Sequence, residues 1–235
     1  MAASHTVPAD GPPPALVTLG EAASALEFAR LGRRAIALAR RPRGAGEPVR
    51  VFPGFGTGDA STIALRRYLR GRGYDTRGWG LGRNDGDVPR LTAAASDRVA
   101  ASAEAAGEPV HLVGWSLGGV VAREVARARP DVVAQVVTFG TPVVGGPRHT
   151  SLARLYGPER IAQIEALVAD VERTPIRVPV TAIHSRRDGI VSWRACVDTV
   201  TPGVENVEVG STHIGMGVDP DIWEIVLDRL AARRV

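Results

Sequence analysis

A serine flanked by glycines in the middle of the chain restricts its fold more than any other feature. The residues Gly114-Trp115-Ser116-Leu117-Gly118-Gly119 follow the apolar run Val110–Val113 and precede a helical pattern over residues 117–129. The chain must therefore turn sharply from a buried strand into a helix, with glycine where side chains would collide. This turn predicts strained backbone angles for Ser116 and places its hydroxyl at the sheet edge, near the positive end of the helix dipole.

Strand and helix patterns alternate along most of the chain. Apolar runs predict strands at residues 49–52, 74–79, 110–114, 132–139, 178–184 and 205–209, separated by helices at 61–70, 93–106 and 117–129 and followed by one at 221–233. This alternation is typical of an α/β fold in which a doubly wound, mainly parallel sheet is covered on both faces. With 235 residues, 44% of them hydrophobic, the chain is long enough for one substantial core.

Two segments do not fit the alternation. Residues 1–20 are rich in alanine, proline and glycine and are predicted to form a flexible arm. Residues 142–177 begin with a Gly/Pro-rich loop, contain a helical stretch near 158–171, and are predicted to form a short cap over one end of the sheet. The remaining chain, residues 21–235, is predicted to be a single domain.

Residues 21–41 form an amphipathic helical pattern. Phe28, Leu31, Ala35 and Leu38 recur at helical spacing, whereas most charged residues, among them Glu27, Arg30 and Arg34, fall on another face. Two interpretations stay open. The helix packs on the domain, or its basic and apolar side chains make a peripheral contact with an anionic membrane or cover a site.

The segment G-x-S-x-G between a strand and a helix resembles the nucleophile turn of the α/β-hydrolase family. The resemblance covers about residues 48–233 and is greatest to bacterial serine esterases and lipases, in which the turn is often G-H-S-x-G-G; here Trp115 replaces that histidine. It implies a doubly wound α/β-hydrolase fold in which Ser116 is the nucleophile. It also implies that an acid and then a histidine follow in the chain.

The order along the chain selects the two partners of Ser116. Of the five histidines, His213 alone follows the last predicted strand and precedes the last helix, where the fold places its base. Asp188 directly follows the strand at 178–184, and its segment Asp-Gly-Ile-Val is similar to the acid segment of bacterial lipases. Asp198 and Asp219 are the alternative acids.

The resemblance also implies two oxyanion donors and a substrate pocket. The donors are the backbone N–H groups of Phe55, after the first core strand, and Leu117, after the nucleophile. Trp115, Val143 and Val144 are expected to contact substrate, with Phe55 and Leu117 as further walls. We expect no metal and no cofactor, because the chain has no His-Glu-x-x-His pattern and no lysine for a phosphate-binding loop.

Charge and cysteine content limit the partners and the compartment. All 29 residues counted as Lys or Arg are arginine, which raises the isoelectric point to about 10.1 although the net charge is only +4. No nucleic-acid-binding motif accompanies that charge, so no nucleic-acid partner is expected. A single cysteine, Cys196, and no recognisable secretory signal at residues 1–14 predict a cytoplasmic protein.

The function expected from these residues is hydrolysis of a small ester or lipid with a short to medium acyl chain, through an acyl-enzyme. Three alternatives stay open: a thioesterase, an acyltransferase with the same three residues, and a non-catalytic protein of this fold that binds a lipid or a partner.

Overall fold

Six parallel strands form the central sheet of the computed structural model, which describes residues 11–144, 146–153, 157–171 and 174–232. Their order is β2-β1-β3-β4-β5-β6, and every neighbouring pair is parallel. The strands are β1 (Pro48–Phe52), β2 (Asp75–Gly78), β3 (Val110–Trp115), β4 (Val133–Phe139), β5 (Val180–Ser185) and β6 (Glu205–Val209). The predicted fold class is therefore confirmed.

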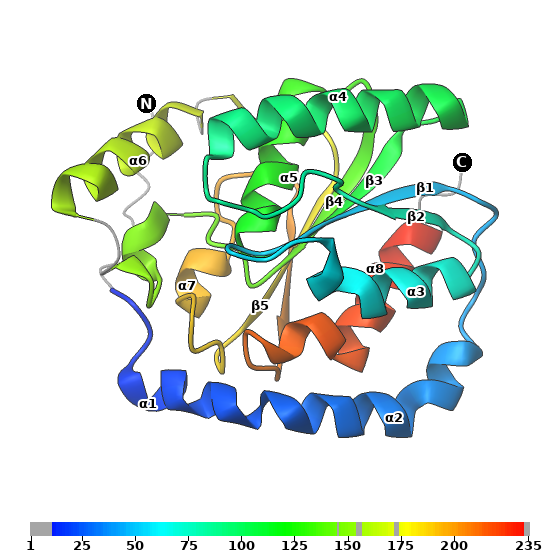
Figure 1. Ribbon diagram of the computed structural model, residues 1–235, viewed down its shortest axis with the longest axis horizontal. Helices are drawn as coiled ribbons and strands as arrows, with labels where there is room; N and C mark the ends of the chain where they lie inside the picture. Colours follow the sequence, from blue (N-terminus) through cyan, green and yellow to red (C-terminus); the bar gives the residue numbers. More distant parts are fainter. Residues whose placement is uncertain (1–10, 145, 154–156, 172–173, 233–235) are drawn as a thin grey trace.

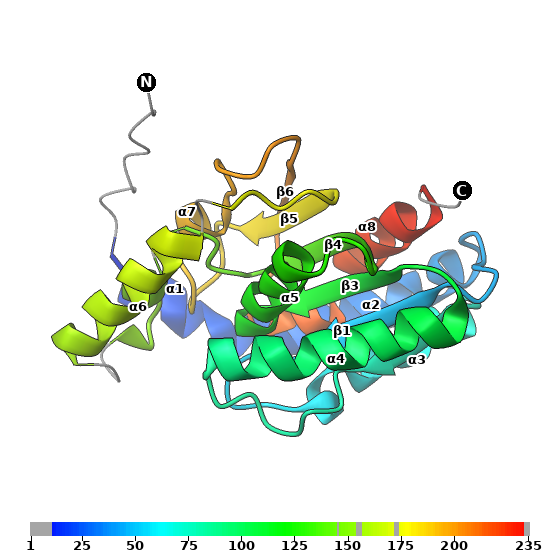
Figure 2. The same ribbon diagram turned by 90° about the horizontal axis from the view of Figure 1, so that it is seen from above.

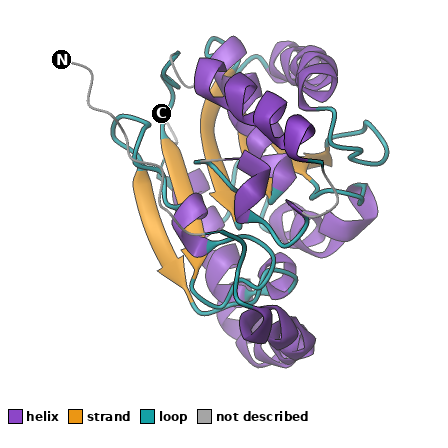
Figure 3. Cartoon of the chain, turned by 90° about the vertical axis from the view of Figure 1, so that its left-hand side faces the viewer, coloured by secondary structure: helices purple, strands orange, loops and turns teal. Residues whose placement is uncertain are grey.

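Helices cover both faces of this sheet. The α-helices are α1 (Ala15–Leu19), α2 (Ala25–Ala39), α3 (Ile63–Gly71), α4 (Val88–Ala106), α5 (Leu117–Ala128), α6 (Pro158–Val171), α7 (Trp193–Cys196) and α8 (Pro220–Ala231). Short 3-10 helices are η1 (Gly20–Ser24), η2 (Asp59–Thr62), η3 (Gly146–His149) and η5 (Gly215–Val218). In Figure 1, α4 and α5 lie above the strands, and α2, α3 and α8 lie below them. Figure 3 shows the same layers from the side, with helices on both sides of the strands.

Alternation along the strands divides the core into two clusters. Val49 and Val51 of β1 face the cluster that contains Leu38 of α2, together with apolar residues of α3 and α8. Phe52 of β1 and Leu112 of β3 belong to the other cluster, which contains apolar residues of α4 and α5. Successive side chains of a strand point to opposite faces, so each strand contributes to both layers and the sheet is buried on both sides.

The N-terminal region differs from its prediction. Residues 15–19 form α1, within the segment predicted to be a flexible arm, so the arm prediction is wrong for these residues; residues 1–10 lie outside the described part of the chain. From α1, the chain continues through η1 into α2, and the three helices lie along one side of the molecule (Figure 1).

The orientation of α2 also differs from its prediction. Leu38 is buried and Leu31 packs on the core, as expected, but Phe28 is 64% exposed. Glu27 is instead buried, and Arg30 and Arg34 form ion pairs with Asp221 at the start of α8. The face of α2 that meets the domain is therefore partly ionic, which hydrophobic periodicity alone does not indicate. The helix packs on the domain, as the first interpretation of residues 21–41 predicts.

The segment between β4 and β5 leaves the sheet at its carboxyl edge. It includes η3 and α6, and the helix lies within the range predicted for the cap. An isolated antiparallel bridge joins Thr150 to Val191 in the loop after β5. Figure 2 shows α6 beyond the ends of the strands. Whether this segment covers a substrate stays a prediction.

A buried ion pair fixes α5, the helix that follows the serine turn. Arg123 Nη2 lies 2.7 Å from Asp198 Oδ2 and 2.9 Å from Thr201 Oγ1. The second oxygen of Asp198 accepts hydrogen bonds of 2.9 Å from the backbone N–H groups of Val200 and Thr201. Burial acts to raise the pKa of Asp198, but Arg123 and these hydrogen bonds outweigh it and hold the pKa below its ordinary value.

We expect Arg123→Leu to lower the free energy of unfolding by roughly 3–5 kcal/mol, because it leaves the Asp198 carboxylate buried without its cation. Urea denaturation at pH about 7 measures this loss. Since the pKa of Asp198 is lowered by folding, the pair stabilises the protein above the ordinary carboxyl pKa, and its contribution is lost as the pH falls through the lowered value. The difference between wild type and variant should therefore shrink in acid.

The matched control is Arg129→Ala, whose partner Asp131 is exposed, and it should change stability little. An Arg123→Leu protein as stable as the wild type at neutral pH contradicts the prediction.

Candidate active site

Ser116 occupies a strained turn between β3 and α5. Its φ is 54° and its ψ is −128°, and it is the one non-glycine residue with a positive φ in the described part of the chain. A Cβ on Gly114 would lie 2.4 Å from Gly119 Cα, and one on Gly118 would lie 2.5 Å from the carbonyl oxygens of Phe52 and Pro53. Only glycine allows the first turn of α5 to approach β1 this closely. The predicted strain at Ser116 is therefore present.

The loop after β1 lies against Ser116. A Cβ on Gly54 would be 3.4 Å from Ser116 Cβ, so this loop borders the candidate nucleophile. Buried Asn84 holds it in place: its Nδ2 donates to the Pro53 carbonyl at 2.9 Å, and its backbone carbonyl accepts from Gly56 N–H at 2.7 Å. The predicted oxyanion donor Phe55 therefore belongs to a loop that is fixed beside Ser116.

The second predicted donor is the N–H of Leu117, the first residue of α5. At this position a helix offers no intrahelical acceptor, so the N–H is free to bind an external oxygen. The positive end of the helix dipole also favours negative charge there. The side chains of Phe55 and Leu117 both lie near Gly86, where a Cβ would be 3.1 Å from the Phe55 ring and 3.8 Å from Leu117 Cδ2.

His213 and Asp188 form a buried pair. His213 Nδ1 lies 2.7 Å from Asp188 Oδ2, and both side chains are almost completely buried. Asp188 Oδ1 accepts from the backbone N–H groups of Ile190 at 2.9 Å and Val191 at 2.7 Å. Oδ2 accepts from the imidazole when the ring hydrogen is on Nδ1, and in that tautomer Nε2 is the acceptor.

The end of β4 connects Ser116 to this pair. Phe139 O accepts from Ser116 N–H at 2.9 Å, and Thr141 Oγ1 donates to Ser116 O at 3.0 Å. Between them, Gly140 has a φ of 57°, and a Cβ there would lie 2.9 Å from His213 Nδ1. Ser116 and His213 thus contact the same short segment. Both residues lie in the described part of the chain, and no hydrogen bond joins Ser116 Oγ to His213 Nε2 there.

The alternative acids lie elsewhere. Asp198 pairs with Arg123, and Asp219 is the N-cap of α8, where its side chain accepts from Asp221 N–H. Burial raises the pKa of Asp219 above its ordinary value. Neither carboxylate bonds to a histidine in the described chain, and Asp188 therefore remains the candidate acid.

Of the other predicted site residues, Trp115 packs beside His213, and Val143 and Val144 bond to α7. The Trp115 ring is 6.0 Å from the His213 ring and 6.4 Å from that of Phe139, centre to centre, so it packs beside the base. The backbone N–H groups of Val143 and Val144 donate to Ala195 O in α7 at 2.8 and 3.1 Å. Their loop is therefore held against α7, which follows the loop that contains Asp188. Contact of Val143 and Val144 with substrate stays a prediction.

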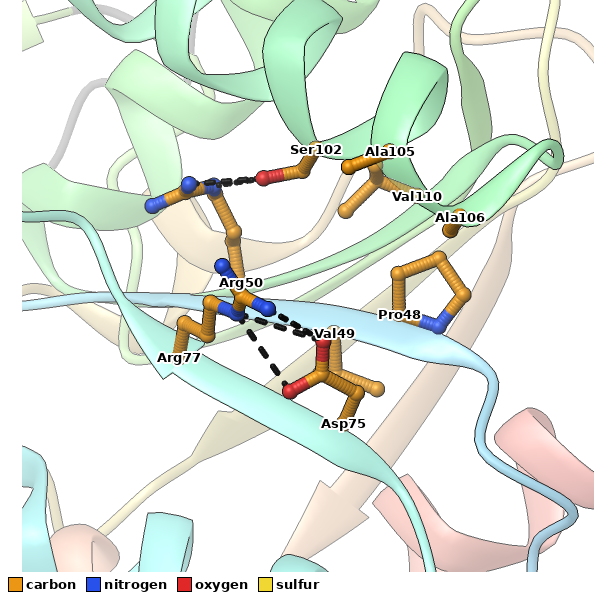
Figure 4. A pocket seen from close by; sticks show the side chains of 9 residues that line it. All are labelled: Pro48, Val49, Arg50, Asp75, Arg77, Ser102, Ala105, Ala106 and Val110. Carbon is orange, nitrogen blue, oxygen red and sulfur yellow. Dashed lines mark hydrogen bonds and ion pairs between the residues drawn. The ribbon is translucent and has the colours of Figure 1, made fainter.

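A small pocket lies away from this site. It has a volume of about 60 Å³ and is lined by Pro48, Val49, Arg50, Asp75, Arg77, Ser102, Ala105, Ala106 and Val110 (Figure 4). Pro48, Asp75 and Val110 begin their strands, whereas Ser116, Asp188 and His213 follow the carboxyl ends. Its buried arginine, Arg50, already bonds to Ser102 Oγ and Gly78 O. This pocket is too small and too distant to be part of the candidate site.

Three further observations concern a thiol nucleophile, metal binding and membrane-spanning helices. Burial raises the pKa of the Cys196 thiol well above its ordinary value, which disfavours a thiolate nucleophile. Within the described ranges, no three His, Cys, Asp or Glu side chains are grouped to hold a metal ion. None of the helices in those ranges has both the length and the apolar composition needed to cross a bilayer.

Sequence reasoning missed two residues that fix this site. The sequence patterns assign no site role to either residue, Asn84 or Glu21. Asn84 bonds across the loop after β1, and Glu21 accepts from backbone groups of both the Asp188 and the His213 loops. Neither belongs to a recognisable motif. The only signal was that Glu21 is an isolated acid at the start of an apolar and basic helix.

Solved structures with the same architecture include lipases and esterases. Lipase B from Aspergillus fumigatus is 19% identical with a TM-score of 0.65, over 81% of this chain and 53% of that one, so this chain spans about half of its length. A putative aryl esterase from Burkholderia cenocepacia is 16% identical with a TM-score of 0.59, over 82% and 94%. A monoacylglycerol lipase from Paleococcus ferrophilus is 17% identical with a TM-score of 0.58, over 80% and 97%. At these identities the likeness shows the fold.

No curated protein matches the chain. The model of the alpha/beta hydrolase family matches residues 51–234, a range that contains Ser116, Asp188 and His213. The chain therefore belongs to the α/β-hydrolase family.

Proposed function

We propose that the protein hydrolyses carboxylic esters through an acyl-enzyme on Ser116. The observation that carries this proposal is the 2.7 Å hydrogen bond between His213 Nδ1 and Asp188 Oδ2, beside the strained turn of Ser116. A serine hydroxyl is a weak nucleophile and needs a base that a third group orients. The Asp188–His213 pair provides an oriented base, and the turn presents the hydroxyl.

In the acylation half-reaction, Ser116 Oγ attacks the ester carbonyl carbon while His213 Nε2 takes the hydroxyl proton. The carbonyl π electrons move to oxygen, and the Phe55 and Leu117 N–H groups bind the oxyanion. Asp188 stabilises the imidazolium. When the intermediate collapses, the bond to the alcohol oxygen breaks and His213 protonates the leaving alcohol. Catalytic hydrogen bonds often tighten only with substrate in place, so we expect Ser116 Oγ to bond to His213 Nε2 in the substrate complex.

In the deacylation half-reaction, water replaces the alcohol. His213 Nε2 removes a proton from the water as its oxygen attacks the acyl carbon, and the same two N–H groups bind the second oxyanion. Collapse releases the carboxylic acid and returns the proton to Ser116. Thioesters have the same acyl carbon, and an acyltransferase replaces the water with another alcohol. A short to medium aliphatic acyl group is part of this proposal, with the Phe55 and Leu117 side chains, which lie near Gly86, as expected walls.

Ser116→Ala and His213→Ala should each reduce kcat for a soluble p-nitrophenyl ester by at least about 10³-fold, because the two groups act as a unit. Their double variant should be little worse than either one. Asp188→Asn should lose activity while remaining folded, because the amide does not enforce the required imidazole tautomer. Initial rates over a series of acyl chain lengths measure these effects and locate the preferred chain.

Asp198→Asn and Asp219→Asn are the matched acid controls. If either one, but not Asp188→Asn, abolishes turnover, the acid assignment is wrong. If Ser116→Ala retains wild-type turnover, the acyl-enzyme is wrong, and the non-catalytic alternative becomes the better account.

We further propose that the outer face of α1 and α2 contacts an anionic lipid surface. The exposed large apolar residues on these helices are Leu16, Leu19, Leu26, Phe28 and Ile36, and Ile214 beside the base adds a sixth. Arg33 of α2 and Arg40 directly after it are exposed. Of the acids of the segment, Glu21 accepts from His213 N–H, and Glu27 is buried and pairs with Arg30. An apolar helix face with only positive charge suits the boundary of an anionic bilayer.

Leu26→Glu and Ile36→Glu together should abolish binding to phosphatidylglycerol vesicles, while turnover of a soluble ester stays unchanged. The reason is that two carboxylates remove apolar area and are repelled by the anionic surface. Co-sedimentation with phosphatidylglycerol and phosphatidylcholine vesicles measures the binding. Ile63→Glu is the control, because Ile63 is an exposed apolar residue on α3.

Point variants are preferable to removal of the N-terminal helices, because Leu38 of α2 belongs to the core. Equal binding of the wild type to both kinds of vesicle, or of the double variant to phosphatidylglycerol, contradicts the lipid contact.

A further inference from the structure

We propose that Glu21 is a positioning residue for the catalytic pair, because it joins the acid loop to the base loop. The proposal rests on the acyl-enzyme function described above. It makes the N-terminal segment part of the active-site support, although this segment precedes the first strand of the sheet.

The carboxylate of Glu21 accepts three backbone hydrogen bonds. Its Oε1 accepts from Gly189 N–H and from His213 N–H, both at 2.8 Å, and its Oε2 accepts from Ile214 N–H at 2.9 Å. Gly189 directly follows the candidate acid, and His213 is the candidate base. One side chain therefore binds the backbone of both loops next to the reacting groups.

Contacts of the residues on either side of Glu21 hold it against these two loops. Thr18 Oγ1 donates to Gly189 O at 2.8 Å, and Ser24 Oγ lies 2.8 Å from Thr212 Oγ1. A Cβ on Gly189 would be 2.6 Å from Val17 O, so only glycine allows the acid loop to meet α1 this closely. The contacts of Thr18 and Ser24 lie on both sides of Glu21 in sequence, one to each loop.

A carboxylate is the group suited to this position. Each of the two loops exposes N–H groups that no strand pairs, and a charged acceptor binds such groups about twice as strongly as a neutral one. Glu21 fixes the His213 backbone relative to Gly189, and thereby the separation between the imidazole and Asp188. The Asp188–His213 bond is 2.7 Å long and joins two almost completely buried side chains, so a small displacement of either loop would break it. Misplacement of a catalytic group by about 1 Å costs on the order of 10²-fold in rate.

The decisive comparison is between Glu21→Ala and Glu21→Gln. With a soluble p-nitrophenyl ester, we expect Glu21→Ala to lower kcat by about 10- to 100-fold and to leave KM within about twofold, because substrate contacts are intact. Glu21→Gln should recover part of kcat. Its amide oxygen can still accept from Gly189 and His213, but its NH₂ group faces the Ile214 N–H donor.

A second measurement reports the geometry without any substrate. The proton on His213 Nδ1, shared with Asp188, gives a low-field proton magnetic resonance signal, which His213→Ala identifies by its loss. We expect this signal to be present in the wild type and broadened or lost in folded Glu21→Ala. Circular dichroism at the same temperature establishes that the variant is folded.

Arg34→Ala is the matched control. It removes ion pairs between α2 and Asp221 and Glu224 of α8, and so loosens the same N-terminal segment away from the two loops. It should lower the melting temperature but leave kcat and the low-field signal as in the wild type.

The proposal is overturned if folded Glu21→Ala keeps wild-type kcat and the low-field signal, or if kcat falls only in proportion to the unfolded fraction. It is also overturned if Arg34→Ala loses kcat equally. Failure of the acyl-enzyme function is recognised separately, because Ser116→Ala would then retain turnover, while the low-field signal still tests the role of Glu21.

Discussion

The close approach of α5 to the ends of β1 and β4 is the contact on which the rest of the structure depends. It exists because Gly114, Gly118 and Gly119 have no side chains; a Cβ on Gly119 would lie 2.0 Å from Thr141 Oγ1. The same approach forces Ser116 into its positive φ and directs the first N–H groups of α5 to the sheet edge. Buried Arg123 then holds α5 through Asp198. Strain at one residue is thus sustained by packing and ion pairing around it.

A parallel sheet explains why residues distant in sequence gather at this edge. All six strands run in one direction, so the loops that follow β1, β3, β5 and β6 emerge together. These loops carry Phe55, Ser116, Asp188 and His213 respectively. The sheet brings the loops near one another, but it does not fix their final separation. That separation is set by hydrogen bonds that Asn84 donates to the loop after β1 and that Glu21 accepts from the His213 loop.

The N-terminal helices show where sequence patterns were insufficient. Hydrophobic periodicity places Phe28 on one stripe with Leu31 and Leu38 and Glu27 on another face, but Phe28 is exposed and Glu27 is buried. The side of α2 that meets the domain combines apolar contacts with ion pairs to α8, near the opposite end of the chain. No local window contains both partners, so the pattern could not reveal this ionic contact. The arm prediction was wrong for residues 15–19 for a related reason, since Thr18 and Glu21 bond to the loops that contain Gly189 and His213.

The sequence by itself determined the fold class, because alternating strand and helix patterns around a glycine-spaced serine allow few other architectures. It also determined the candidates Ser116, Asp188 and His213 through their order along the chain. Only the tertiary structure distinguishes the neighbours of Asp188 from those of its alternatives: Asp188 bonds to His213, Asp198 pairs with Arg123, and Asp219 caps α8. It also decided that α1 and α2 lie against the acid and base loops. Such contacts depend on side chains from distant segments meeting in space, and a short stretch of sequence encodes only one side of each contact.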